Sequence, residues 1–252
     1  MCICIEYYIY LFKSEGMEVV MKKIFIYTGS NNSNSLTKRI CDYTVNVLEY
    51  ELGKVEVKNY KYDTHRIDCC KGCAVCFRKG SCALDELDDM KEMKKDMLSS
   101  DIIIFATPVY FMCVSGAMKI FLDRLTYWTH LFRLSKKTGV IIVTGDQNGL
   151  KETIEYLYEF CLRLGLINIK IIAYNKLYDT KEYIKSDIQV KSEEIKDYYE
   201  SSKRYLVDSY QNQMFVNYKS YINFLPDGVY EKEYWRDKGM LDTVDFRTFI
   251  KQ

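Results

Sequence analysis

Five of the ten cysteines in this sequence lie within fourteen residues, in the stretch CCKGCAVCFRKGSC at positions 69–82. Cys70, Cys73, Cys76 and Cys82 have the spacing C-x-x-C-x-x-C-x5-C. Cysteines this close together let a single loop wrap a [4Fe–4S] cluster, in which each thiolate binds one iron. The spacing therefore favours a four-iron redox centre.

Three other interpretations of these cysteines stay open. Structural zinc sites usually pair two C-x-x-C knuckles across a longer gap, so three ligands within seven residues fit zinc less well. A disulfide is disfavoured in the reducing compartment that we expect for this chain. The cysteines can also bind no metal at all. Cys69 lies outside the spacing and is left out of the predicted ligand set.

A polar stretch with the sequence GSNNSNS, at positions 29–35, is the second candidate for chemistry. It follows a strand-like run and opens a helix. Backbone N–H groups at a helix N-terminus, together with hydroxyl side chains, favour a phosphate. An ordinary capped helix start is the alternative, because Ser and Asn are also preferred caps. The candidate phosphate ligands are Ser30, Asn32, Asn34, Ser35 and Leu36, the last through its backbone N–H.

A third stretch, TPVYFMCVSGAMKIFLDR at positions 107–124, combines a proline turn, an aromatic pair and a Ser-Gly that opens a helix. A flat cofactor ring needs an apolar wall with backbone donors and acceptors at its polar edge. Pro108, Val109, Tyr110 and Phe111 can supply that wall. The alternative is an aromatic loop that only caps the core.

Alternating strand-like and helix-like segments, from residue 22 to about 174, must position these three stretches. Such alternation predicts a parallel sheet with helices on both faces. The predicted helices run from 36 to Gly53, 85–98, 115–125 and 150–164. Gly165 is expected to cap the helix at 150–164. The helix at 85–98 is expected to bury a stripe made of Leu87, Met90, Met93 and Met97. The predicted strands are 22–28, 55–60, 101–107, 139–144 and 168–174.

The apolar patterns of the five strands predict their order in the sheet. The first, third and fourth strands are continuous apolar runs, as central strands covered on both faces should be. The second and fifth alternate, as half-exposed edge strands do. This agrees with the order 2-1-3-4-5, which leaves a ligand crevice at the carboxyl ends of strands one and three. The dinucleotide fingerprint G-x-G-x-x-G is absent from the first loop.

The stretches GSNNSNSLT, CKGCAVCFRKGSC, DD at 88–89 and TPVYFMCVSGAMKIFLDR together resemble the NAD(P)H-dependent FMN reductase group of the flavodoxin-like superfamily, and within it the iron–sulfur flavoproteins. The resemblance covers residues 21–175. It implies an α/β flavodoxin-like three-layer sandwich with a five-stranded parallel sheet. Asn31 and Asn32 depart from the family, which often has a proline and an arginine there.

The same resemblance implies one FMN per subunit and a [4Fe–4S] cluster. The phosphate would lie in the 29–36 loop, and the flavin ring would lie against residues 108–111. The implied cofactor contacts are Ser30, Asn32, Asn34, Ser35, Leu36, Pro108, Val109, Tyr110, Phe111, Ser115, Thr144 and Gly145, and the implied cluster ligands are Cys70, Cys73, Cys76 and Cys82.

The implied function is that of an FMN-dependent oxidoreductase or electron-transfer flavoprotein. It would pass electrons between NAD(P)H or ferredoxin and an acceptor, as a homodimer or homotetramer. One alternative is a cluster-free NAD(P)H-dependent reductase of quinones, nitro compounds or flavins. Another is a non-catalytic, zinc-stapled binding module of the same fold.

Composition excludes several partners. Lys and Arg number 36 and Asp and Glu number 35, so no bulk charge attracts nucleic acid or an anionic membrane. No apolar, uncharged run of about 18 residues is present, so we expect no membrane span. We expect a cytoplasmic protein. His65 and His130 are expected to be structural, and Asp123 and Arg124 to form a structural pair or a dimer contact.

The two ends of the chain are expected to lie outside the flavin-binding domain. Residues 1–20 read as a leader, and Met21 as the natural start, because the first strand-like run begins there. An intact peptide from residues 1–20 in the natively expressed protein, found by mass spectrometry, would contradict this. Residues 176–252 are expected to form a mainly helical extension, with a long helix near 188–210, that serves as a subunit interface or a flavin lid.

Overall fold

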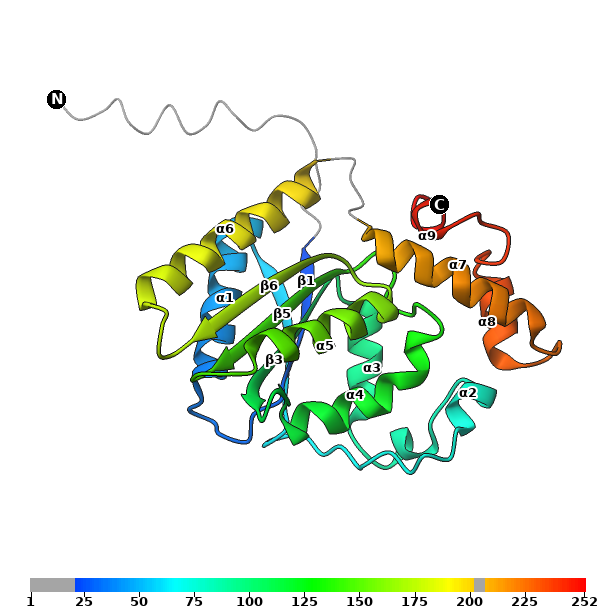
Figure 1. Cartoon of the computed structure of the whole chain (residues 1–252), viewed down its shortest axis with the longest axis horizontal. Coiled ribbons are helices and arrows are strands. Elements are labelled where there is room, and N and C mark those ends of the chain that lie inside the picture. The colour runs from blue at the N-terminus through cyan, green and yellow to red at the C-terminus, as the bar shows by residue number, and fades with distance from the viewer. Residues whose placement is uncertain (1–20, 202–206) are drawn as a thin grey trace.

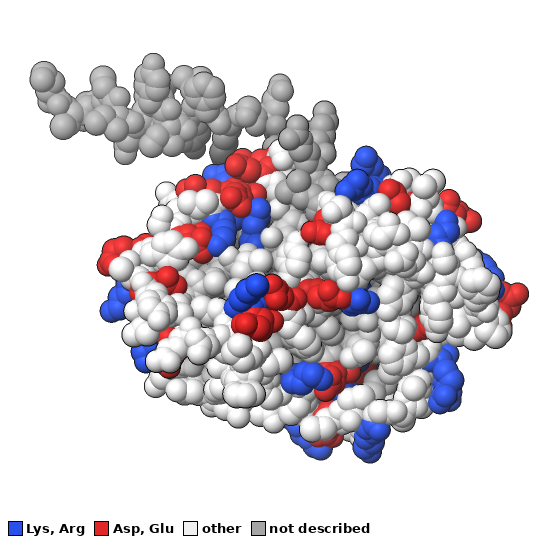
Figure 2. Space-filling model, in the orientation of Figure 1, with Lys and Arg blue, Asp and Glu red and all other residues white. Residues whose placement is uncertain are grey.

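The computed structural model describes residues 21–201 and 207–252 (Figure 1). The predicted leader, residues 1–20, lies outside the described residues. Within the described ranges, no helix is both long enough and apolar enough to cross a membrane. On the face seen in Figure 2, acidic and basic side chains are scattered in small groups.

Five parallel strands form the sheet in the predicted order, and a sixth, unpredicted strand pairs with one of them. The sixth, β4 (Cys113–Val114), runs antiparallel to the end of β3, so that Val109 faces Val114. The predicted number of five strands was therefore wrong, because the short hairpin adds a sixth strand. The order across the sheet is β2 (Val55–Lys61), β1 (Lys22–Thr28), β3 (Ile102–Tyr110), β5 (Thr138–Gly145) and β6 (Ile167–Asn175).

The burial of each strand explains its place. Ile102–Ala106 of β3 and Val140–Val143 of β5 are buried residue after residue, because helices cover both faces of the central strands. In β2, Val55 and Tyr60 are buried and the residues between them are partly or fully exposed, as at an edge. The distinction between continuous and alternating apolar patterns thus predicts the parallel order.

Helices cover both faces of the sheet (Figure 1). One face packs against α1 (Leu36–Leu52) and α6 (Lys181–Glu200). The other packs against α3 (Met90–Ser99), α4 (Gly116–Thr129) and α5 (Leu150–Leu164). Gly165 caps α5 at φ 90°, as predicted. The three-layer sandwich is therefore present.

The helix predicted at 85–98 begins later than expected. Residues Ala83–Glu86 form a 3₁₀ helix, and α3 starts only at Met90. Met90, Met93 and Met97 are fully buried, but Leu87 is 62% exposed and is not part of the stripe. The helix starts late because the carboxylates of the DELDD run bind a buried arginine and neighbouring backbone instead of continuing the helix.

The C-terminal extension is helical, as predicted. Of the long helix predicted near 188–210, residues 202–206 lie outside the described part of the chain, and α6 covers the residues up to Glu200. Helix α6 ends at Glu200, and Asp208 starts a new helix by accepting a hydrogen bond from the N–H of Tyr210 (2.7 Å). The later helices are α7 (Ser209–Phe224), α8 (Tyr230–Asp237) and α9 (Phe246–Phe249). They share one hydrophobic core with α3, α4 and α5, and lie on the outside of that layer (Figure 1).

Candidate functional site

A cavity of about 740 Å³ opens at the carboxyl ends of the central strands. It lies where the order 2-1-3 reverses, which is the usual ligand position in such sheets. Of the twelve predicted cofactor contacts, the structure brings eleven to its wall: Ser30, Asn32, Asn34, Ser35, Leu36, Pro108, Val109, Tyr110, Phe111, Thr144 and Gly145.

The polar loop between β1 and α1 is shaped by its own side chains. Ser35 caps α1 and accepts a hydrogen bond from the N–H of Lys38 (3.2 Å). Asn32 accepts one from the N–H of Asn34 through its side-chain oxygen (2.9 Å). These contacts hold the first turn of α1 against the cavity, where its unpaired N–H groups and the helix dipole favour an anion.

Ser115 is the predicted contact that does not line the cavity. It is 1% exposed, and its hydroxyl donates to the carbonyl of Gly29 and accepts from the N–H of Met118 (3.1 Å). A Cβ on Gly29 would lie 2.6 Å from Cβ of Met118, so only glycine fits at this approach. Ser115 therefore ties the start of α4 to the polar loop.

The aromatic wall is a strained two-residue hairpin. Phe111 and Met112 connect β3 to β4 with φ angles of 44° and 65°. Two-residue hairpin loops with positive φ at both positions prefer Asn-Gly, because larger side chains are strained there. Phe111 is also 99% exposed. Strain and exposure together at the edge of a ligand cavity point to a functional role for this tip.

The loop after β5 closes the third side of the cavity. Gly149 has a φ of 87°, and a Cβ there would lie 2.8 Å from Cα of Met112. The hydroxyls of Thr37 and Thr144 are 2.6 Å apart, which joins α1 to the end of β5. The three loops therefore form one continuous rim.

Sequence reasoning missed three cations that line this cavity: Arg39, Lys176 and Lys181. Arg39 follows the polar loop within the first turn of α1, so its position could have been read from TKRI. Lys176 and Lys181 follow the last strand, where no motif guided the prediction. Positive side chains beside a helix N-terminus and an apolar wall are the donor set that a phosphate-bearing flavin requires.

All four predicted metal ligands line a second cavity, of about 430 Å³, whereas Cys69 does not. The cysteine segment, residues 69–82, forms one side of this cavity. Three residues of α4 form the other side: Asp123, Thr126 and Tyr127. All eight described cysteines are free thiols, so the segment contains no disulfide.

The backbone of the segment winds around this cavity. Gly72, Ala74 and Gly80 have φ angles of 65°, 54° and 73°, and they flank the unpredicted short helix α2 (Val75–Lys79). The N–H of Gly72 donates to the sulfur of Cys70 (3.4 Å). Such N–H···S bonds are among the features that tune iron–sulfur clusters.

The arrangement of the thiols bears on which metal group fits. In the described residues, no three His, Cys, Asp or Glu side chains are placed to hold one metal ion. Zinc needs its ligands at about 2.3 Å from a single atom, whereas a four-iron cluster takes one thiolate per iron. Cys70, Cys73, Cys76 and Cys82 line one cavity, so they lie where thiolate ligands of such a group would be needed. Burial, followed by the nearby Cys82, raises the pKa of the Cys76 thiol.

The two histidines line neither of these two cavities. The ring of His65 packs on Tyr60, with the ring centroids 4.8 Å apart, and His130 is hydrogen-bonded to Glu231 (2.9 Å). Asp123 and Arg124 do not pair with each other, whereas the expected dimer contact stays a prediction. Asp123 binds Lys119 on the helix surface, whereas Arg124 turns inward.

Several curated proteins are similar to this chain over part of its length. An iron-sulfur flavoprotein of Archaeoglobus fulgidus is 38% identical over 95 residues, which are 38% of this chain and 42% of that protein. An iron-sulfur flavoprotein of Methanocaldococcus jannaschii is 30% identical over 147 residues, which are 58% of this chain and 74% of that protein. The chain spans about half the length of most of the curated relatives that it matches.

Solved structures agree on the fold. The crystal structure of RosB with bound 8-demethyl-8-formylriboflavin-5′-phosphate has a TM-score of 0.59 and 15% identity, and the match covers 82% of this chain and 89% of that one. At this identity the likeness speaks for the fold alone. The model of the NADPH-dependent FMN reductase family matches residues 21–175, from the first strand through the last. The chain therefore belongs to the NADPH-dependent FMN reductase family.

Proposed function

We propose that this chain is an FMN-dependent oxidoreductase that also carries a [4Fe–4S] cluster and transfers electrons. The observation that carries the proposal is that Cys70, Cys73, Cys76 and Cys82 line one cavity in a chain that also has a flavin-type cavity at its strand ends. The relatives named iron-sulfur flavoproteins support the same reading.

Each cofactor, when bound, supplies its own chemistry: FMN accepts a hydride or two electrons and can release them singly, and the cluster carries one electron at a time. The work of the chain is then to bind and orient. The first turn of α1 and Arg39 would hold the phosphate. Val109 and Tyr110 would form the wall for the ring, and the loop after β5 would exclude water from its far edge.

The donor would be NAD(P)H or a reduced ferredoxin, and the acceptor a ferredoxin or a small molecule such as a quinone or nitro compound. We further propose a cytoplasmic homodimer or homotetramer. The free thiols support the location. The exposed hairpin tip at Tyr110 and Phe111 supports an interface at the flavin. Lys176 and Lys181 of the extension border this cavity, which supports its role as interface or lid.

Anaerobic purification tests the proposal, with FMN, iron and sulfide measured together with an absorption spectrum. We expect about one FMN and about four irons and four sulfides per chain. Cys73→Ser should lose iron and keep FMN, whereas Cys69→Ser, the matched control, should keep both. A colourless protein with one zinc per chain would refute the redox proposal.

A second candidate is a cluster-free NAD(P)H-dependent flavin reductase. The observation that favours it is the exposure of Cys70 and Cys73, since exposed cluster ligands are open to solvent and oxidant. In that case the protein would contain FMN without iron. Cys73→Ser would then reduce quinones or nitro compounds as fast as the natural chain.

A further inference from the structure

The two ends of the cysteine segment meet beside α4. Residues 66–68 lead into the segment, and residues 85–89 follow it. The carboxylate of Asp88 accepts a hydrogen bond from the N–H of Asp68 (2.9 Å). The carboxylate of Asp89 accepts one from the N–H of Arg66 (2.8 Å). The side chains after the last cysteine thus bind the backbone before the first.

One arginine joins both ends at once. Arg124 is 2% exposed, and one of its terminal nitrogens donates to the carbonyl of Asp68 (2.9 Å) and to the carboxylate of Asp88. The other donates to Asp85 (2.6 Å) and to Asp88 (3.3 Å). Its hydrogen bonds run through these two nitrogens, whereas its Nε is buried without a partner in the described structure. This side chain therefore spans the segment from entrance to exit.

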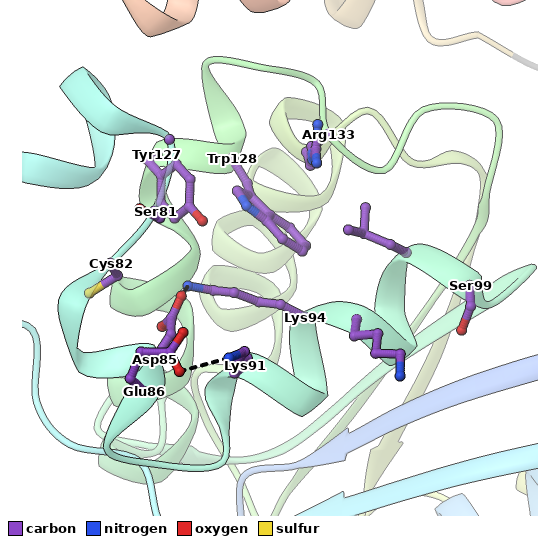
Figure 3. A pocket seen from close by; sticks show the side chains of 13 residues that line it. Ser81, Cys82, Asp85, Glu86, Lys91, Lys94, Ser99, Tyr127, Trp128 and Arg133 are labelled. Atoms are coloured by element: carbon purple, nitrogen blue, oxygen red, sulfur yellow. Dashed lines mark hydrogen bonds and ion pairs between the residues drawn. The ribbon is translucent and has the colours of Figure 1, made fainter.

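A second buried cation, Lys94, makes a useful contrast. It is 6% exposed and donates to both oxygens of Asp85 (2.9 and 2.7 Å), with its ammonium 5.0 Å from the ring centre of Tyr127. Figure 3 shows it reaching from α3 toward Asp85, with Cys82 beside them. Its hydrogen bonds and its ring contact join it to Asp85, after the last cysteine, and to Tyr127 on α4. Lys94 therefore shares the network of Arg124 without joining the two ends.

The chemistry of this network favours a positional role over a stabilising one. Two cations, Arg124 and Lys94, face two carboxylates, so the buried charge is balanced. Balanced buried ion pairs are often no more stable than apolar residues of the same volume, because desolvation offsets the attraction. What they do supply is fixed geometry. The planar fork of arginine can hold two carboxylates and a carbonyl together, which an ammonium cannot.

We propose that Arg124 is the positioning residue of the cysteine segment. By binding Asp68 before Cys70 and Asp85 and Asp88 after Cys82, it closes the segment into a loop on α4 before any metal binds. The effect on cluster assembly rests on the proposed function, whereas the closure of the loop does not. A ligand set that is already closed loses less conformational freedom when it binds its metal group.

Hydrogen exchange of the metal-free protein, followed by mass spectrometry, tests the closure. In Arg124→Lys we expect exchange at least about tenfold faster at both 66–72 and 82–90, with β1 and β3 unchanged. Lys94→Met, the matched control, should speed exchange only at 82–90. If exchange at 66–72 is unchanged in Arg124→Lys, or equals that in Lys94→Met, Arg124 does not join the two ends.

A second variant keeps the test decisive if Arg124→Lys does not fold. Arg124→Met combined with Asp88→Asn removes one cation and one anion and leaves the pair of Lys94 with Asp85 intact. This double variant should fold and show the same fast exchange at 66–72. Slow exchange there would overturn the proposal.

Reconstitution with iron and sulfide tests the consequence. Arg124→Lys should bind at least about threefold less iron than the natural chain and keep its full FMN content. Full iron content in this variant would overturn the role in assembly. If the natural chain itself binds no iron, the proposed cluster fails, and the exchange experiment still decides the role of Arg124.

Discussion

Phe111 and Met112 hold backbone angles that side chains of their size rarely adopt. Each left-handed residue costs roughly 1–2 kcal/mol relative to a relaxed backbone. Phe111 is 99% exposed, so it gains almost no burial within the chain in return. We therefore expect the strain to be compensated outside the folded monomer, by a bound flavin, a substrate or a second subunit.

We expect Phe111→Asn with Met112→Gly to raise the free energy of unfolding of the flavin-free protein by about 1–2 kcal/mol, because Asn-Gly suits this turn. The same change should weaken flavin binding or slow turnover. Denaturant unfolding and flavin titration measure the two effects. Phe224→Asn is the control, since Phe224 is 89% exposed but lies at a helix end with an ordinary backbone. A loss of stability in the double variant would contradict the strain.

Asp88 gives the metal-free protein a defined acid dependence. Burial raises the pKa of its carboxyl. The hydrogen bonds from Arg124 and from the N–H groups of Asp68 and Met90 lower the pKa by more than burial raises it, so the net pKa lies below its ordinary value. A carboxyl with a lower pKa in the folded state contributes stability above its unfolded pKa of about 3.9 and loses it below.

We therefore expect the free energy of unfolding to fall as the pH drops below about 4, and to fall less steeply in Asp88→Asn. Denaturant unfolding at a series of pH values measures this. Asp146→Asn is the control, because the Asp146 side chain is 78% exposed. Equal slopes in the natural chain and Asp88→Asn would show that Arg124 does not hold this carboxyl charged.

At the scale of elements, α4 serves both candidate sites. Its N-cap, Ser115, is bonded to the polar loop of the flavin cavity, and Arg124 and Tyr127, further along, contact the cysteine segment. A single rigid helix thus fixes the two cavities relative to each other.

Removing the N-cap of α4 should therefore lower the stability of the protein and also weaken binding at the flavin cavity. We expect Ser115→Ala to lower the free energy of unfolding by about 1–2 kcal/mol and also to weaken FMN binding, because the Gly29 loop loses its anchor. Asp208→Ala removes the N-cap of α7, away from the flavin cavity, and serves as the control. Equal FMN affinity in the two variants would contradict this role for Ser115.

The sequence predicts the parallel strands and most of the helices, because the helices show apolar periodicity and the strands are either continuous apolar runs or alternating ones. It misses the hairpin strand β4, since Phe111 and Met112 are not turn-forming residues and no local rule expects positive φ there. It misses α2, which has five residues and too few turns to show a period. The inward position of Arg124 depends on Asp85 and Asp88, far away in the chain, so no local pattern reveals it.

At the scale of the whole molecule, the C-terminal extension is part of the core and reaches the cysteine segment. Phe215, Trp235 and Phe246 are fully buried and surround Phe132, and Trp235 donates to the carbonyl of His130 (2.8 Å). Aromatic packing of this extent ties the extension to the flavodoxin-like part. Removing the extension should therefore expose core surface.

The direct contact between the extension and the cysteine segment lies at Gly80 and Tyr230. A Cβ on Gly80 would lie 2.2 Å from the ring of Tyr230, and Gly80 has a φ of 73°. Gly80→Ala therefore carries two costs, one from the backbone and one from the ring. Only the second disappears when Tyr230 is also changed to Ala.

We expect Gly80→Ala alone to lower the free energy of unfolding by about 2–3 kcal/mol. When Tyr230 has already been changed to Ala, the same substitution should lower it by only about 1 kcal/mol. Denaturant unfolding of the four proteins of this double-mutant cycle measures the coupling. Gly53→Ala is the control, because Gly53 has a similar φ of 77° and nothing within 4 Å of its added Cβ. Its cost should be the same with and without Tyr230. Additive effects of Gly80→Ala and Tyr230→Ala would mean that α8 does not press on the cysteine segment in solution.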